Sequence, residues 1–316
     1  MRTRAVRLYG KNDLRIEEFE LPAIKEDEIL ACIVTNSVCM SDHKAAEQGA
    51  DHKRIPKDVD RNPIMLGHEF CGEIVQVGSK WSSSFAPGDR FSIQPALNYK
   101  GALDAPGYSY HYIGGDATYV VIPNEVMEMD CLLKYEGDAF FLGSLAEPVS
   151  CIVGTYHAMY HTTGGSYEHK MGIVKGGNLA IIAGVGPMGL GAIDYGIHCD
   201  RKPALMVVTD IDDARLARAA ALYPVEEAAR NGVKLVYLNT KELSDPVATM
   251  LALRPGPGSA ALLVISPVHS LLAPSSALLS PSFFLPFFSF PPLPSFSARL
   301  PFSPVPSASP HIVGPS

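Results

Sequence analysis

The sequence predicts an α/β chain in which a mostly-β, barrel-like domain is followed by part of a doubly wound parallel sheet. Up to about residue 150, short runs of β-forming residues are separated by turns such as APGDR and IGGDA. From residue 151 on, apolar runs alternate with helical stretches, and this alternation favours a parallel sheet. We therefore expect domains at residues 1–150 and 151–266, and a separate segment at 267–316.

Three segments of the first domain have the composition of β-strands. They are EILACIVTNSVC, GEIVQVGS and ATYVVIP, each rich in Val, Ile, Thr or Tyr. Short strands with frequent turns between them favour antiparallel pairing. We expect these strands to build the barrel-like domain.

The second domain is expected to begin with a helix in CIVGTYHAMYH. The runs NLAIIAG, ALMVVTD and KLVYLNT are short and apolar, which is typical of parallel strands buried on both faces. Helices are expected between them, over residues 187–197 and 214–222. A fourth strand is expected at 261–265.

The final segment has low complexity. Every residue from 278 to 297 is Phe, Ser, Leu or Pro, the four amino acids specified by codons made only of pyrimidines. Frequent prolines prevent regular elements, and the apolar residues follow neither the helical nor the strand period. We expect 267–316 to be a disordered, non-native tail, translated from a retained intron or after a frameshift.

Composition excludes several classes of function. A net charge of −7 argues against nucleic acid or an anionic membrane as the main partner. The six cysteines show no CxxC spacing, so we expect reduced thiols and a cytoplasmic location. The N-terminus lacks the apolar core of a secretory signal, and no apolar run reaches the ~20 residues of a membrane-spanning helix.

A glycine-rich motif follows the first apolar run of the second domain. In AIIAGVGPMGLGAIDYG, Gly184, Gly186 and Gly189 have G-x-G-x-x-G spacing, with Pro187 and Met188 between the last two. The first glycine permits a tight turn, the second lets a pyrophosphate approach the backbone, and the third allows close packing of helix on strand. Pro187 suits the first turn of the helix. The motif predicts a dinucleotide site.

An acidic residue ends the next apolar run. Asp210 lies about 20 residues after the third glycine, where a carboxylate accepts hydrogen bonds from an adenosine ribose and repels a 2′-phosphate. We therefore expect NAD to be preferred over NADP. Arg215 and Arg218 lie nearby and weaken this preference.

Residues suited to a metal occur in three separate segments. CMSDHK contains Cys39, LGHEFCGEI contains His68 and LAEPVSC contains Glu147. A thiolate, an imidazole and a carboxylate with one open position form a catalytic zinc site. Glu69 is an alternative ligand or a neighbour of the ligands, and Asp42 is suited to orient the imidazole of His68.

The order C-x-S-D, G-H-E, E-P and then G-x-G-x-x-G resembles the zinc-dependent medium-chain alcohol and polyol dehydrogenases, over about residues 1–253. The resemblance implies a GroES-like catalytic domain and a partial Rossmann domain. The stretch EPVSCIVGTYHAMYHTTGGSYEHKMGIVKGG is similar to the L-sorbose-1-phosphate reductase branch, with a loop inserted at 162–177. The chain departs from the family pattern at its C-terminus, which we expect to be truncated and aberrant.

By resemblance, the chain transfers hydride between NAD(H) and a polyol or a ketose, free or phosphorylated. The candidate catalytic residues are Ser41, which passes on the substrate proton, His43, one residue closer to Cys39 than in some relatives, and Glu69. One catalytic zinc is expected, and no structural zinc, because residues 90–120 contain no cysteine. The family suggests a homo-oligomer, although the dimer edge is expected to be missing here.

Two alternatives stay open at this point. One is a non-catalytic product that keeps the motifs but lacks the final third of the enzyme. The other is a relative of the zinc-free quinone reductases, against which the potential ligands argue.

Overall fold

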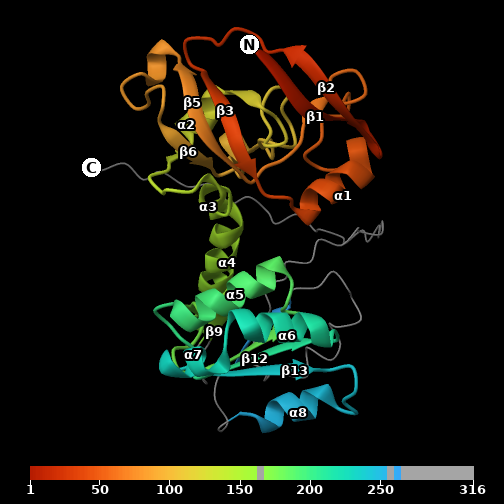
Figure 1. The fold of residues 1–316 in the computed structure, drawn as a ribbon, viewed down its shortest axis with the longest axis vertical. Helices are drawn as coiled ribbons and strands as arrows, with labels where there is room; N and C mark the ends of the chain where they lie inside the picture. Colours follow the sequence, from red (N-terminus) through yellow and green to blue (C-terminus); the bar gives the residue numbers. More distant parts are fainter. Residues whose placement is uncertain (162–166, 255–259, 265–316) are drawn as a thin grey trace, which may run out of the picture.

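A computed structural model describes residues 1–161, 167–254 and 260–264, the last five by their backbone alone. Figure 1 shows a β-rich body at the top and an α/β body below it, joined by a column made of helices α3 (Phe140–Ser144) and α4 (Ala146–Ala158). The predicted α/β architecture, a mostly-β unit followed by a parallel sheet, is confirmed.

The N-terminal unit contains two antiparallel sheets. The larger has the strand order β7-β3-β5-β6-β8 and the smaller β2-β1-β4. In β5 the apolar Ile74 points into the core while its neighbours Glu73 and Val75 face solvent, which is the alternation expected of a half-buried strand. The strands are β1 (Arg2–Gly10), β2 (Asp13–Glu20), β3 (Ile29–Asn36), β4 (Ile64–Met65), β5 (Phe70–Val77), β6 (Arg90–Ile93), β7 (Tyr119–Ile122) and β8 (Leu132–Lys134).

Short helices fill the connections of this unit. The longest is α1, which follows β3 and lies at the lower edge of the β-rich body in Figure 1. The core of the large sheet includes Phe70 and Phe91, whose rings meet edge to face at 6.2 Å. The helices are α1 (Met40–Gln48), α2 (Asn124–Glu128) and three 3₁₀ turns, η1 (Gly49–Asp51), η2 (Ser79–Trp81) and η3 (Tyr99–Gly101).

The second unit is a four-stranded parallel sheet with the order β13-β12-β11-β14. The chain steps outward from β11 to β12 and β13, and then returns to pair β14 with the other side of β11. This reversal places a topological switch point beside β11, where open α/β sheets bind their ligands. The elements are β11 (Asn178–Ile182), α5 (Pro187–His198), β12 (Leu205–Asp210), α6 (Asp213–Leu222), α7 (Val225–Arg230), β13 (Lys234–Asn239), α8 (Pro246–Ala252) and β14 (Ala260–Val264).

Three local expectations need correction. The helix expected in CIVGTYHAMYH ends at Ala158, because Met159 turns into an extended conformation and is buried in the core of the parallel sheet. The chain then forms β9 (Tyr160–His161), which pairs with β10 (Lys170–Met171). Helices α7 and α8 were not predicted. The strand expected over EILACIVTNSVC, which is β3, ends at Asn36, three residues before Cys39.

Helix α4 runs across the expected domain boundary between residues 150 and 151. The expectations for the tail at 267–316 and for part of the inserted loop lie outside the described residues. Among the helices that the structure describes, none has the length and apolar character needed to cross a membrane.

Candidate active site

The candidate metal ligands come from two chain segments that the large sheet brings together. β3 and β5 are antiparallel neighbours, and Asn36 at the end of β3 pairs with Phe70 at the start of β5. The chain leaving β3 therefore lies beside the chain entering β5, and the Ser37 amide donates to the Glu69 carbonyl oxygen at 2.9 Å. Cys39 follows as the residue that precedes the first turn of α1. Its place at the positive end of a helix favours negative charge there.

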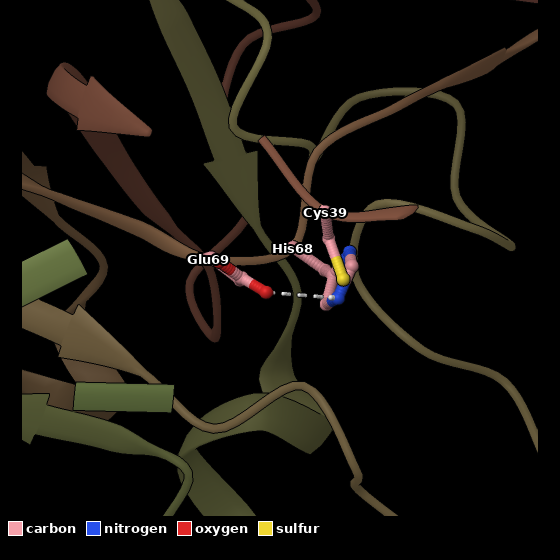
Figure 2. Close-up of side chains that lie close together, drawn as sticks. All are labelled: Cys39, His68 and Glu69. Carbon is pink, nitrogen blue, oxygen red and sulfur yellow. Dashed lines mark ion pairs between the residues drawn. The ribbon is translucent and has the colours of Figure 1, made fainter. Parts of the chain in front are cut away.

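Cys39, His68 and Glu69 form a cluster of converging side chains (Figure 2). Their ligand atoms lie within 4.8 Å of one another, and His68 Nε2 is 3.8 Å from Glu69 Oε1. Burial raises the pKa of the Glu69 carboxyl, so its charged form needs a cation. Sulfur, nitrogen and carboxylate oxygen are ligands that Zn²⁺ accepts, and three of them leave an open position. The residues present therefore fit a catalytic zinc ion.

Asp42 supports His68 from behind. Its Oδ1 lies 2.8 Å from His68 Nδ1, and both side chains are buried. Burial disfavours the imidazolium, but the hydrogen bond to Asp42 and the contact with Cys39 outweigh it and raise the pKa of His68 to about 10. With the Nδ1 proton held by Asp42, Nε2 is the nitrogen left to bind a metal. The orienting contact expected for Asp42 is present.

Two hydroxyl groups lie against the cluster. Ser41 Oγ donates to Cys39 Sγ at 2.9 Å and lies 3.4 Å from His68 Nε2. Tyr108 Oη donates to Ser41 Oγ at 2.7 Å and lies 3.3 Å from the same nitrogen. Burial raises the pKa of Tyr108, so this phenol stays protonated near neutral pH. The arrangement is a short chain of hydroxyl groups that ends at the metal cluster.

Tyr108 was not among the residues predicted from the sequence. The signal available was the preceding Gly107, which has φ of +79°. A Cβ atom at this position would lie 2.2 Å from the Gly67 carbonyl oxygen and 3.0 Å from His68 Cβ. Only glycine lets the two loops approach so closely, and that approach carries Tyr108 to the cluster.

Two other candidate residues lie outside the cluster. The side chain of His43 is 61% exposed on α1, and its Nε2 is 3.3 Å from Glu47 Oε1, so the structure does not bring it to the hydroxyl groups. Successive residues on a helix are rotated by about 100° about its axis. His43 therefore points away from the side of α1 on which Ser41 and Asp42 face the cluster. Glu147, in the first turn of α4, accepts from Cys151 Sγ at 3.6 Å. Its charge is near enough to add to the raised pKa of Glu69.

The glycine-rich loop has the structure that its spacing predicts. A Cβ atom at Gly189 would lie 2.1 Å from the Gly184 carbonyl oxygen, so the third glycine permits contact between α5 and the loop. Nothing lies within 4 Å of a Cβ atom at Gly186, which leaves its backbone open to a ligand. Pro187 begins α5, and Met188 is exposed beside it. The amides at this helix end are available to phosphate oxygens.

Asp210 lies next to this loop. β12 is the parallel neighbour of β11, and the Gly184 amide donates to the Thr209 carbonyl oxygen at 2.9 Å. The Asp210 carboxylate accepts from the amides of Ile211 and Asp212 at 2.8 and 3.2 Å. These bonds fix the carboxylate at the carboxyl edge of the sheet, where a ribose on the loop would meet it.

A half-buried cysteine beside a buried histidine and glutamate in a mostly-β unit, together with a glycine-rich loop on a parallel sheet, defines a metal- and dinucleotide-dependent oxidoreductase. Residues 25–130 match the alcohol dehydrogenase GroES-like domain. The chain is 50% identical to L-sorbose 1-phosphate reductase of Klebsiella pneumoniae over 314 residues, 99% of this chain and 75% of that protein. It is 45% identical to mannitol-1-phosphate 5-dehydrogenase of Aliivibrio fischeri, over 99% of this chain and 74% of that protein. The chain belongs to the zinc-dependent medium-chain alcohol and polyol dehydrogenases.

Solved structures share the fold. The 2R,3R-butanediol dehydrogenase of Bacillus subtilis matches with a TM-score of 0.66 and 21% identity, over 88% of this chain and 74% of that one. The galactitol-1-phosphate dehydrogenase of Escherichia coli matches with a TM-score of 0.61 and 22% identity, over 88% and 72%. The resemblance inferred from the four motifs is thus confirmed.

Proposed function

We propose that this chain is a zinc- and NAD-dependent dehydrogenase that interconverts a phosphorylated polyol and its ketose. The convergence of Cys39, His68 and Glu69 carries the proposal, because these side chains provide a catalytic donor set in which the histidine and the glutamate are buried. The relatives named for L-sorbose 1-phosphate and mannitol 1-phosphate support a sugar-phosphate substrate. Their similarity to 99% of this chain favours an enzyme over a non-catalytic product.

Cys39, His68 and Glu69 would hold the zinc, and one position would stay open for the substrate oxygen. When bound, zinc supplies Lewis acidity that stabilises negative charge on that oxygen. Asp42 fixes the tautomer of His68, so that Nε2 keeps its lone pair. Glu147, near Glu69 but outside the three-residue cluster, is the less direct of the two carboxylates, so we propose Glu69 as the ligand.

Ser41 and Tyr108 would hydrogen-bond and orient the reacting hydroxyl of the substrate. Ser41 lies against both Cys39 and His68, so a substrate oxygen at the open position would be within reach of its hydroxyl. Tyr108 donates to Ser41 Oγ, and the second lone pair of this oxygen is left to accept from the substrate hydroxyl. The raised pKa of Tyr108 keeps its proton in place, so its role is to orient Ser41 rather than to exchange charge.

The glycine-rich loop and Asp210 would hold the dinucleotide. When bound, the nicotinamide carries the hydride. The open backbone at Gly186 suits the pyrophosphate, and the fixed carboxylate of Asp210 suits a free ribose 2′-hydroxyl. Arg215 Nε lies 3.8 Å from Asp212 Oδ2, so the positive charge of Arg215 is already partly balanced. Less of it is left to attract a 2′-phosphate, which strengthens the preference for NAD. The proposal includes one catalytic zinc per chain and no structural zinc.

The state of the cysteines supports a proposal for the cellular compartment. All six are free thiols in the structure. Unpaired cysteines suit a reducing compartment, and we propose the cytoplasm. The partner is a small-molecule substrate.

Enzyme assays test the proposal directly. The purified chain is incubated with NAD⁺ and mannitol 1-phosphate, and NADH is followed by its absorbance. We expect turnover that Cys39→Ser abolishes, while Cys199→Ser, a buried cysteine remote from the cluster in the core of the parallel sheet, keeps it. Turnover that survives Cys39→Ser would contradict the proposed metal site.

A further inference from the structure

Tyr108 joins the metal cluster to a second group of side chains. Its hydroxyl contacts Ser41 and His68, as described above. Its ring stacks on the imidazole of His52, with centroids 5.7 Å apart and planes at 18°, and lies 5.5 Å from Arg54 Cζ. One tyrosine side chain therefore separates the reacting position from a guanidinium and an imidazole.

This second group is positively charged. Among the described residues, the Nε of Arg54 is buried without a hydrogen-bond partner. Burial lowers the pKa of His52, and the positive charges of Arg54, Lys53 and Lys44 lower it further. A buried guanidinium nitrogen without an acceptor is costly unless a ligand supplies one.

The local backbone presents both side chains as donors. The Arg54 amide donates to His52 Nδ1 at 3.3 Å, so neutral His52 carries its proton on Nε2. Ser109 Oγ donates to the Arg54 carbonyl oxygen at 2.8 Å and anchors this segment without using the guanidinium. A planar guanidinium beside an imidazole N–H is well suited to a phosphate group.

We propose that Arg54 and His52 form a subsite for the phosphate dianion of the substrate, whose reacting carbon lies at the cluster of Cys39, His68 and Glu69. The proposal rests on the proposed function. It adds the residues that recognise the phosphate. The two groups contact the hydroxyl and the ring of Tyr108, respectively, and so lie within one residue of each other.

The structural alternative is that Arg54 only packs on the face of Tyr108. Such a cation–π contact needs the charge but no anion. Arg54→Gln would then disturb Tyr108 and Ser41, and it would impair phosphorylated and unphosphorylated substrates alike. A phosphate subsite instead predicts a loss confined to phosphorylated ligands.

The experiment compares mannitol 1-phosphate with mannitol on the full chain. Calorimetry measures binding of each compound, and NADH formation gives kcat/KM. For Arg54→Gln, we expect affinity and kcat/KM for mannitol 1-phosphate to fall about 10- to 100-fold, the effect of losing a hydrogen-bonded charge. The affinities for mannitol and NADH should be unchanged. His52→Gln, which keeps an N–H donor, should reduce the affinity for mannitol 1-phosphate less than Arg54→Gln does. Arg61→Gln is the matched control, since Arg61 is exposed in the same segment.

The outcomes separate this inference from the proposed function. Equal losses for mannitol and mannitol 1-phosphate, no loss for either, or a wild-type chain that does not bind mannitol 1-phosphate would each overturn the subsite. If mannitol is oxidised and Arg54→Gln does not change the preference for the phosphate, the dehydrogenase proposal stands and the subsite falls. If neither compound is oxidised but binding of mannitol 1-phosphate still depends on Arg54, the subsite stands and the dehydrogenase proposal falls. Circular dichroism establishes that each variant is folded.

Discussion

Gly189→Ala tests how the glycine-rich loop is built. The added methyl would lie 2.1 Å from the carbonyl oxygen and 2.3 Å from the carbonyl carbon of Gly184, both backbone atoms that no rotamer change can move aside. Helix α5 must therefore shift away from the loop. Overpacking of this kind costs about 1–3 kcal/mol. For a protein of this size each kcal/mol lowers Tm by about 2–4 °C, so we expect a decrease of about 2–12 °C.

Gly186→Ala is the matched change at the preceding glycine of the motif, three residues earlier. Nothing lies within 4 Å of its new methyl group, and its φ of −79° suits alanine. The cost to stability is at most about 0.5–1 kcal/mol, because alanine precedes a helix less well than glycine. The methyl would occupy the space through which a pyrophosphate reaches the backbone, so NADH affinity should fall at least tenfold.

Thermal denaturation and NADH fluorescence titration measure the two effects separately. We expect Gly189→Ala to be the less stable variant and Gly186→Ala to lose affinity for NADH while it stays nearly as stable as wild type. An unchanged Tm in Gly189→Ala would refute the packing argument. Wild-type NADH affinity in Gly186→Ala would refute the assignment of the loop to the pyrophosphate.

Three further predictions follow from single residues. The pKa of His68 is about 10 in the metal-free native state and about 6.5 in the unfolded chain, so the free energy of unfolding of metal-stripped protein should fall as pH rises through this interval. Urea unfolding at a series of pH values measures this decrease, and Asp42→Asn should make the dependence on pH weaker. Ala183 has φ of +54°, so Ala183→Gly should stabilise the fold by about 0.5–1 kcal/mol, whereas Ala180→Gly in the regular strand β11 should destabilise it; a lower Tm for Ala183→Gly would contradict this. Asp210→Ala should narrow the preference for NADH over NADPH by roughly tenfold, about 1.4 kcal/mol, and an unchanged ratio in fluorescence titrations would remove Asp210 from cofactor selection.

Much of the second unit follows from local sequence. The apolar runs of β11, β12 and β13 are long enough to identify buried parallel strands, and the glycine motif fixes where α5 begins. The expected fourth strand at 261–265 is found one residue earlier, as β14 (Ala260–Val264). The end of α4 was not predictable, because Met159 leaves the helix to fill a core formed by residues distant in sequence.

The site was predictable where residue type alone limits the chemistry. Cys39, His68 and a carboxylate were expected as ligands from residue type alone, with Glu147 first and Glu69 as the alternative. The pairing of β3 with β5 brings Glu69, not Glu147, into the three-residue cluster. Contacts that depend on loop conformation were not predictable. Tyr108 reaches the cluster because of the close approach at Gly107, and a glycine before a tyrosine does not show by itself which loop the chain approaches. The structure does not bring His43 to the cluster, because this residue lies on the exposed side of α1.

The zinc content of the purified chain tests the central claim most directly. Elemental analysis of protein prepared without chelators should find about one zinc per chain, held by the cluster of Cys39, His68 and Glu69. Cys39→Ser and Glu69→Gln should lose most of it, and Glu147→Gln should keep it. Two zinc ions per chain would contradict the single site, and a metal lost from Glu147→Gln but kept by Glu69→Gln would contradict the ligand set proposed for it.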